Sequence, residues 1–206
     1  MPPGCAAARG CGKGAATKGP PARGFRESEE RSDLPTKPIM PAAPADPGFD
    51  PAAHRMIAEQ RWFEDFRLGE RFPLPSRTMT DAVFLAFQAA SGDNHPVHYD
   101  REYCRRHGMP DMLAHGYQVA IQTVAGAGIF PHLVEESLRA FLEQSSRFLH
   151  PVFAGDTLYP ALEVDELSPN RSTGVVGLRS TVHNQSGVLV LDGRHRYLIR
   201  RRPAAG

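Results

Sequence analysis

The spacing of apolar residues changes along the chain and predicts helices before residue 131. Apolar side chains recur at helical spacing over residues 81–90, directly after Thr80, so we expect a helix that Thr80 caps. A second, short helix is expected over residues 102–107, with Asp100 as its cap and Gly108 at its end. Residues 116–130 contain no charged side chain and are apolar on most sides, which predicts a helix buried on nearly its whole circumference.

Residues typical of β-strands dominate after Pro131. We expect strands over residues 141–150, 157–165, 173–184 and 188–199, with a tight hairpin at Ser186 and Gly187. Before the first helix, Gly69, Pro73 and Pro75 predict a turn and a short extended stretch. One buried helix followed by antiparallel strands is an α+β arrangement in which a sheet wraps around a central helix.

The first 52 residues have a different composition from the rest of the chain. Ala, Gly and Pro fill half of the first fifty positions, so this segment buries too little apolar surface to offset the entropy of ordering it. Residues 1–52 are therefore predicted to be a disordered extension and residues 53–203 a folded domain. The extension is basic before Glu27, as transit sequences are, but it has no apolar stripe, and a plain disordered extension is favoured.

Charge and cysteine content argue against several classes of protein. Lys and Arg number 24 against 23 Asp and Glu, so no net field favours nucleic acid or an anionic membrane. No apolar run approaches the ~18 residues that span a bilayer. The cysteines are few (Cys5, Cys11 and Cys104), which fits a reducing compartment better than a disulfide framework. We expect a cytoplasmic protein that binds neither nucleic acid nor membrane.

The segment SGDNHPVH, residues 91–98, contains the chemically most informative pattern. It places the carboxylate of Asp93 and the imidazole of His98 five residues apart on a turn that Gly92 and Pro96 shape. If both side chains face one cavity, they can hold a water molecule and exchange protons with it. We expect burial to raise the pKa of Asp93. The sequence leaves open which of the two side chains takes the first proton.

A second pattern, Ala114-His115-Gly116, stands at the start of the predicted buried helix. Because glycine lets a carbonyl oxygen approach the backbone closely, the Gly116 amide is a candidate donor to a developing oxyanion. The candidate substrate-binding residues are Ser91, His95, His115 and Val119. Ser91 also has the position of a helix-end or turn hydroxyl, and His98 alone would as readily be a packed core histidine.

Other interpretations of the same residues concern metal, thiol and phosphate chemistry. His95 and His98 with Asp93 and His115 could form a metal site, but Pro96 prevents the regular helix on which such spacing normally works, and we expect no metal. Cys104 is expected to be a small core residue rather than a nucleophile. The basic residues at 105–107, 194–196 and 200–202 could meet phosphates, although a solvated surface is favoured.

Taken together, the motifs SGDNHPVH, AHG and FLHPVFAGDTL resemble the MaoC-like hydratases, which include the (R)-specific enoyl-CoA hydratases. The resemblance extends from Phe63 to Arg201. It implies a hot-dog fold, a homodimer, a CoA thioester substrate and neither a metal nor an organic cofactor. It also implies that Asp93 and His98 are the catalytic pair and Gly116 the oxyanion donor. His95 departs from the asparagine that the family usually has, which changes the local hydrogen-bonding groups.

The resemblance predicts a hydro-lyase that reversibly adds water to a 2-enoyl-CoA and gives a (R)-3-hydroxyacyl-CoA. Hot-dog thioesterases and short acyl-carrier-protein dehydratases commonly place an acidic residue on the central helix, and residues 116–130 contain none. The alternative is a non-catalytic acyl-CoA-binding or partner subunit. A metal-dependent hydrolase is a third, minor possibility. Acyl-chain length, and CoA against acyl-carrier protein, stay open.

Overall fold

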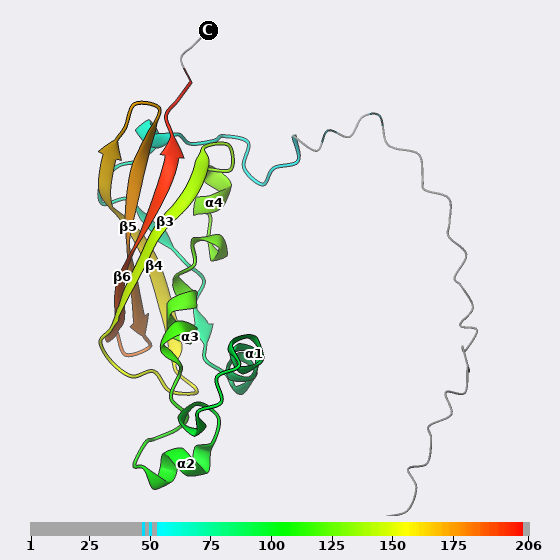
Figure 1. The fold of residues 1–206 in the computed structure, drawn as a ribbon, viewed down its shortest axis with the longest axis vertical. Helices are drawn as coiled ribbons and strands as arrows, with labels where there is room; N and C mark the ends of the chain where they lie inside the picture. The colour runs from blue at the N-terminus through cyan, green and yellow to red at the C-terminus, as the bar shows by residue number, and fades with distance from the viewer. Residues whose placement is uncertain (1–46, 48–49, 51–52, 204–206) are drawn as a thin grey trace, which may run out of the picture. The chain divides into compact units, whose positions relative to one another are not determined.

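Four long strands build one antiparallel sheet: β3 (Leu138–Phe148), β4 (Thr157–Pro169), β5 (Thr173–Asn184) and β6 (Leu189–Arg200). Burial alternates along β4 and β6, whereas β5 is buried on both faces over much of its length and β3 is largely exposed. The short strands β1 (Arg71–Pro73) and β2 (Arg77–Thr78) both pair with β4. The strand order is β1-β4-β5-β6-β3, which leaves β3 at one edge of the sheet (Figure 1). The predicted α+β class and antiparallel sheet are confirmed, and each predicted strand is present within a few residues of its expected ends.

The structure, a computed structural model, describes residues 47, 50 and 53–203. The predicted disordered extension, residues 1–52, lies outside the described residues except for Pro47 and Asp50, so its disorder stays a prediction. Among the described residues, no helix is both long enough and apolar enough to cross a membrane.

Two helices before the central segment begin and end where the sequence indicates. Helix α1 (Asp81–Ser91) has Thr80 as its N-cap, whose hydroxyl accepts from the Val83 amide, and it ends at Gly92 with a positive φ of 70°. Helix α2 (Arg101–Arg106) is capped by Asp100, whose carboxylate accepts from the Tyr103 amide at 2.9 Å. Between them lies a 3₁₀ turn, η3 (Pro96–His98). A further 3₁₀ turn, η2 (Phe63–Asp65), precedes β1.

The single helix predicted over residues 116–130 is wrong. The segment forms four short pieces: α3 (Gly116–Ala120), η4 (Ile121–Thr123), η5 (Ala125–Ala127) and α4 (Phe130–Leu133). Val124 adopts an extended ψ of 125°, which ends the helical hydrogen bonding, and the glycines that follow have low helix propensity. Gly128 is needed for close packing, because a Cβ there would lie 2.6 Å from Leu74 Cδ2.

The central segment is also more exposed than its apolar composition suggested. Tyr117, Ile121 and Val124 are between 47 and 69 % exposed. Neighbouring large apolar side chains of the edge strand β3 and its C-terminal end are exposed as well. We call this set the α3–β3 face: Tyr117, Ile121, Val124, Phe141, Leu142, Phe148 and Leu149. The expectation of burial on nearly the whole circumference therefore fails on this side.

The core consists of two groups of buried side chains along the inner face of the sheet. One group packs β1, β4, β5 and β6 against α4 and includes Phe72, Phe130 and Leu162. The other lies under α1 and α3 and includes Phe84 and Val119, together with residues of β4 to β6. The second group fixes α1 and α3 to the same end of the sheet (Figure 1).

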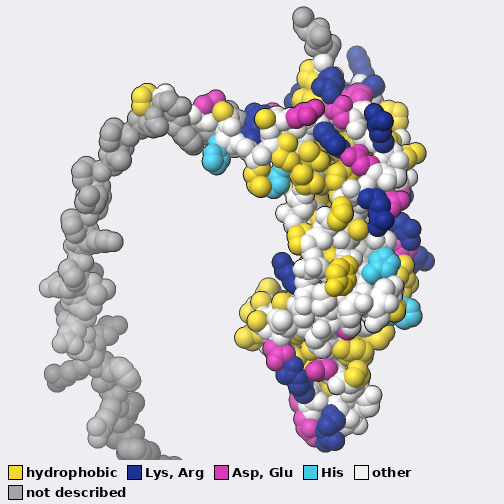
Figure 2. All heavy atoms as spheres, turned by 180° about the vertical axis from the view of Figure 1, so that it is seen from behind, with side chains coloured by type: hydrophobic (Ala, Val, Ile, Leu, Met, Phe, Trp, Pro, Cys, Tyr) yellow, Lys and Arg dark blue, Asp and Glu magenta, His cyan; other side chains and the backbone are white. Residues whose placement is uncertain are grey.

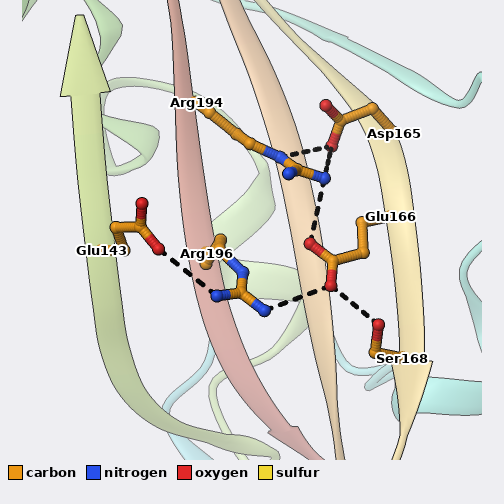
Figure 3. A network of polar contacts seen from close by, with 6 residues as sticks. All are labelled: Glu143, Asp165, Glu166, Ser168, Arg194 and Arg196. Atoms are coloured by element: carbon orange, nitrogen blue, oxygen red, sulfur yellow. Dashed lines mark hydrogen bonds and ion pairs between the residues drawn. The ribbon is translucent and has the colours of Figure 1, made fainter.

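The opposite face of the sheet carries a network of ion pairs (Figure 3). Arg196 on β6 contacts both Glu143 on β3 and Glu166 on β4, and Arg194 contacts Glu166 at 2.9 Å. These pairs reach across β5 at Gly177, where a Cβ would lie 2.7 Å from Glu166 Cβ. Arg194 and Arg196 are therefore engaged within the fold, and the idea that they meet a substrate phosphate is not favoured.

We expect Gly177→Ala to lower the free energy of unfolding by about 1–3 kcal/mol, since the added methyl group overpacks against Glu166. Urea denaturation measures this loss. Gly126→Ala is the matched control, because its Cβ would meet no atom within 4 Å and its φ is not positive. An equal effect of the two substitutions would contradict the prediction.

Candidate active site

The turn after α1 fixes the position of the Asp93 carboxylate. The Ser91 hydroxyl accepts from the Asp93 amide at 3.2 Å, so Ser91 acts as a turn hydroxyl. Asp93 Oδ1 accepts from the His95 amide at 2.9 Å. The first hydrogen bond fixes the backbone at Asp93, and the second holds its side chain in one orientation, with Oδ2 available to other partners.

His95 closes the turn in the way an asparagine could. Its Nδ1 accepts from the Val97 amide at 3.2 Å, the role that the side-chain oxygen of asparagine takes as an N-cap. Pro96 follows as the first residue of η3, and the His98 amide bonds back to the His95 carbonyl at 3.0 Å. The departure from the family's asparagine therefore preserves the backbone of the turn.

The orientation of His98 is set by a backbone carbonyl from a distant segment. His98 Nδ1 lies 2.6 Å from the Leu113 carbonyl oxygen, which can only accept a hydrogen bond. Nδ1 therefore carries the proton in the neutral ring, and Nε2 presents a lone pair. The Leu113 amide donates in return to the Val97 carbonyl at 3.0 Å, which fixes η3 against this segment.

His115 has the opposite tautomer for a parallel reason. Its Nδ1 accepts from the Tyr117 amide at 3.0 Å, so the proton of the neutral ring resides on Nε2. His115 Nε2 lies 2.9 Å from Asp93 Oδ2 and donates to it. The His115 and His98 rings lie side by side, with centroids 5.1 Å apart. His115 thus positions Asp93 in addition to capping α3.

Asp93, His98 and His115 converge on one small space. One carboxylate oxygen and one ring nitrogen of each histidine all lie within 4.8 Å of one another, and all three residues are half-buried. The expected rise in the pKa of Asp93 is wrong. The hydrogen bond from the His95 amide lowers the pKa of Asp93 most; burial acts in the opposite direction, and the neighbouring His115 and His98 rings bring the pKa below its ordinary value.

The same three residues form the one metal-like cluster among the described residues, yet their hydrogen bonds do not suit a metal ion. The tautomer that the Tyr117 amide imposes on His115 places a proton on the nitrogen that faces Asp93. Only Asp93 and His98 then have free lone pairs, whereas zinc usually takes at least three protein ligands. The expectation of a metal-free site stays a prediction, with this geometry in its favour.

Gly116 begins α3 next to this cluster. Its amide donates to no acceptor among the residues that the structure describes. A Cβ at this position would lie 3.1 Å from the Phe148 ring, so only glycine leaves the packing of α3 against the end of β3 undisturbed. A pocket of about 340 Å³ opens beside it, lined by His115, Gly116, Phe148 and the neighbouring β3 residues. Asp93 and His98 do not line this pocket, and His115 connects the two.

The remaining candidates lie in the interior or away from the cluster. Val119 is buried in the core beside Phe84, and its role in substrate binding stays a prediction. Cys104 is fully buried and its thiol donates to the Val97 carbonyl, which fits the expected structural role. His195, from the basic run at 194–196, is buried beneath Phe141, and burial lowers its pKa.

Three contributors to the site were missed at the level of sequence. Leu113 acts through its carbonyl oxygen, a group that every residue has, so no side-chain pattern could reveal it. Phe148 reaches Gly116 only because β3 ends there. Tyr99 directly follows His98, so its position next to the motif was a signal that sequence reasoning could have used. Burial raises the pKa of Tyr99, and the nearby Asp93 carboxylate acts in the same direction.

Solved structures with the same chain path identify the class of fold. A structure titled monoamine oxidase regulatory protein, from an Archaeoglobus species, is 31 % identical with a TM-score of 0.65, covering 70 % of this chain and 97 % of that one. A conserved hypothetical protein from Mycobacterium tuberculosis, described as a double hot-dog fold, is 28 % identical with a TM-score of 0.61. The alignment covers 71 % of this chain and 46 % of that one. The described domain is a hot-dog fold.

The chain belongs to the MaoC-like domain family, whose model matches residues 65–185. The (R)-specific enoyl-CoA hydratase of Rhodospirillum rubrum is 26 % identical over 148 residues, which cover 70 % of this chain and 94 % of that protein. Coverage of other curated relatives is smaller: the chain spans as little as 29 % of the length of one of them. The homologues support a hydratase-type enzyme at the level of the family.

The lowered pKa of Asp93 predicts how the stability of the fold depends on pH. The carboxylate stabilises the folded state above the pKa of an unfolded aspartate, about 3.9, and this contribution is lost as pH falls through the lower folded-state pKa. A ¹³C NMR titration should place the Asp93 carboxyl below ordinary aspartates. His115→Phe should raise its pKa by removing one donor, whereas His107→Phe should leave it unchanged. A midpoint above the ordinary value in the native protein would contradict this.

Proposed function

We propose that this protein is an acyl-CoA hydratase that adds water reversibly to a 2-enoyl-CoA and gives the (R)-3-hydroxyacyl-CoA. The convergence of Asp93 and His98 within hydrogen-bonding reach of one small space is the observation that carries the proposal. Membership of the MaoC-like family and the similarity to an (R)-specific enoyl-CoA hydratase support the reaction class.

The two side chains are both hydrogen-bond acceptors in the resting state. Asp93 is a carboxylate because its pKa is depressed, and His98 presents the lone pair of Nε2 because Nδ1 donates to Leu113. A water molecule between them donates one hydrogen to each and turns a lone pair of its oxygen outward. That lone pair is the nucleophile that attacks C3 of the enoyl thioester.

Addition of water then needs one proton to leave the water and one to reach C2. As the new C3–O bond forms, the pair of electrons from the C2–C3 double bond moves toward the thioester oxygen and gives an enolate. One member of the pair takes a proton from the attacking water, and protonation of C2 from the pair restores both groups. His115 takes no proton in this sequence; its Nε2–H holds Asp93 in place.

The thioester oxygen is proposed to accept from the Gly116 amide. This amide has no acceptor among the described residues, and α3 is only five residues long, so the single hydrogen bond rather than a helix dipole supplies the stabilisation. An apolar pocket of about 420 Å³ adjoins that beside Gly116, sharing Tyr117, Ala120 and Gln144 with it. We assign the acyl chain to this pocket.

The local structure around His95 favours catalysis over the non-catalytic alternative. A subunit that had lost its activity would be free to lose the turn, whereas His95 retains the hydrogen bond to the Val97 amide and the pair stays aligned. No metal or organic cofactor has a step in this mechanism. The one cysteine of the described domain, Cys104, is a buried thiol, which agrees with a cytoplasmic location.

A second copy of the chain is proposed to cover the α3–β3 face. β3 is an eleven-residue edge strand whose outer backbone groups meet no other strand among the described residues. Its exposed apolar side chains continue onto α3 and η4, which is typical of an association surface. The structural relative described as a double hot-dog fold is matched by this chain over 46 % of its length, so a single polypeptide there has the length for two such units. Pairing would also enclose the acyl pocket.

Substitution of the catalytic pair gives the direct test of the reaction. We expect Asp93→Asn and His98→Ala each to lower kcat on crotonyl-CoA by ~10²-fold or more, since each removes a proton acceptor of the pair. Loss of the enoyl-thioester absorbance measures hydration. His95→Asn is the matched control on the same turn and should retain most of the activity.

Two outcomes of this assay would overturn the proposal. Full activity in both variants of the pair would remove the mechanism. Native protein that binds crotonyl-CoA without consuming it would favour the non-catalytic subunit. A chelator is expected to leave the rate unchanged, and a rate restored only by added zinc would favour the metal-dependent hydrolase instead.

Association of two copies predicts a separate result. Ile121→Asp places a charge on the α3–β3 face and should convert a dimer to monomers in analytical ultracentrifugation. Leu85→Asp on α1 is the control, since Leu85 is also an exposed helical residue at 65 % exposure but lies outside this face. A native protein that sediments as a monomer would contradict the proposed dimer.

A further inference from the structure

The apolar pocket assigned to the acyl chain is lined on one side by two buried polar side chains of β6, His195 and Tyr197. Its other walls come from α3, η4, η5 and β3. His195 is 3 % exposed and Tyr197 is 8 % exposed. Because a buried polar group destabilises the protein unless it is hydrogen-bonded, the partners of these two side chains decide what this pocket can hold.

One nitrogen of His195 is bonded to a hydroxyl of the helical segment. The Thr123 hydroxyl donates to the Ala120 carbonyl at 2.8 Å, so toward His195 Nε2, which lies 3.1 Å away, its oxygen can only accept. Nε2 therefore carries the proton of the neutral ring, and Nδ1 presents a lone pair. Burial lowers the pKa of His195, which keeps the ring neutral near pH 7.

The other nitrogen of His195 has only a weak partner. Tyr197 Oη lies 3.4 Å from His195 Nδ1, which is longer than the usual hydrogen bond of a hydroxyl. Neither atom has another hydrogen-bond partner among the described residues. Burial raises the pKa of Tyr197 to about 12, so the hydroxyl keeps its proton. One donor and one lone pair beside the pocket are thus incompletely satisfied.

The described residues that line this pocket include no Lys, Arg, Asp or Glu. Arg196 stands between His195 and Tyr197 in the sequence, but it pairs with Glu143 and Glu166 on the opposite face of the sheet (Figure 3). Figure 2 shows Lys and Arg side chains on the surface of the domain with Asp and Glu side chains among them. A carboxylate in the pocket would therefore find no cation, whereas a neutral hydroxyl would find a donor and an acceptor.

The distance from Gly116 to His195 sets the length of the acyl chain. Gly116 and Thr123 are seven residues apart along α3 and η4, or roughly 12 Å. On β3, Phe148 beside Gly116 is four residues from Gln144, the register partner of His195, or roughly 13 Å. An extended chain advances roughly 1.2 Å per bond, so about ten bonds separate the thioester carbon from an oxygen at His195.

We propose that the enzyme selects an acyl group with a hydroxyl about ten bonds from the thioester carbon, and that His195 and Tyr197 bind this hydroxyl. This inference rests on the proposed hydratase function and on the assignment of the acyl chain to this pocket. The substrate hydroxyl accepts from the Tyr197 hydroxyl and donates to His195 Nδ1. A site built to bond a hydroxyl discriminates against an apolar analogue, because the analogue leaves the polar groups of the site buried and unpaired.

Two substrates that differ only at the chain end test this preference. 10-Hydroxy-2-decenoyl-CoA has a hydroxyl where 2-undecenoyl-CoA has a methyl group of similar size. In the native protein, kcat/KM should be at least tenfold higher for the hydroxy substrate. A ratio near one or below it overturns the inference, as does hydration of crotonyl-CoA without hydration of the hydroxy substrate. Protein that hydrates none of these thioesters contradicts the proposed function instead.

Removal of the Tyr197 hydroxyl should reduce the preference. Tyr197→Phe keeps the ring that stacks on Phe141 with centroids 4.9 Å apart, so the wall of the pocket is preserved. The ratio of kcat/KM between the hydroxy substrate and 2-undecenoyl-CoA should fall at least fivefold. Tyr159→Phe is the matched control, because Tyr159 is 48 % exposed on β4 outside the pocket, and it should keep the native ratio. An equal ratio in native protein and Tyr197→Phe overturns the assignment.

A substrate with a carboxylate at the chain end tests the alternative of an anion-binding pocket. For 2-decenedioyl-CoA, kcat/KM should be at least tenfold lower than for the hydroxy substrate, since burial of an unpaired carboxylate is unfavourable. A value equal to or above that of the hydroxy substrate would indicate an anion site and overturn the inference.

¹⁵N NMR of His195 provides a readout that needs no turnover. Saturated 10-hydroxydecanoyl-CoA should shift the Nδ1 resonance upfield, because Nδ1 then accepts a hydrogen bond of ordinary length. Undecanoyl-CoA should leave this resonance in place. The same response to both thioesters would place the hydroxyl away from His195 and contradict the proposed contact, whether or not the protein is a hydratase.

Discussion

The candidate active site depends on two imidazole tautomers that the backbone imposes. The Leu113 carbonyl requires a proton on His98 Nδ1, and the Tyr117 amide requires a bare Nδ1 on His115. As a result, neighbouring rings face the same space with opposite chemistry: His98 Nε2 accepts, and His115 Nε2 donates to Asp93. Both partners are main-chain groups, so the assignment follows from the path of the chain and holds whichever side chains surround it.

This constraint explains how a half-exposed aspartate can work in a proton-transfer pair. The common route to such a pair is burial, which raises the pKa of a carboxyl group. Here the carboxylate is instead stabilised by donors, beginning with the His95 amide, and stays ionised. In the proposed mechanism it accepts a hydrogen bond and orients the water rather than starting as an acid. The Tyr117 amide occupies the Nδ1 lone pair of His115, so that in the neutral ring His115 has no free lone pair for a metal ion, which weighs against a zinc site at this cluster.

Sequence patterns predicted the fold better than they predicted the central segment. Caps at Thr80 and Asp100 and the long strands follow from local rules, because their side chains bond to nearby backbone or alternate across a sheet. The break at Val124 does not, since the apolar composition of residues 116–130 is equally compatible with a long helix. The sequence also could not show that one side of residues 116–130 is exposed in the single chain. A surface that binds another chain and a surface buried in the core are both rich in apolar residues, so the two give the same pattern.

In the candidate active site, too, some features follow from sequence patterns and others do not. Motif and spacing predict Asp93 and His98 as neighbours, and their side chains do converge, together with His115, which directly precedes Gly116 at the start of α3. The direction of the pKa shift was missed because it depends on which amides point at Asp93.

The most direct test of the central claim is a ¹⁵N NMR measurement of the imidazole nitrogens near neutral pH. Long-range ¹H–¹⁵N correlations distinguish a protonated ring nitrogen from a bare one. In the neutral form of each ring, the hydrogen bonds predict that the proton of His98 lies on Nδ1 and that the proton of His115 lies on Nε2. A His98 with a bare Nδ1, or a His115 whose proton resides on Nδ1, would contradict the account.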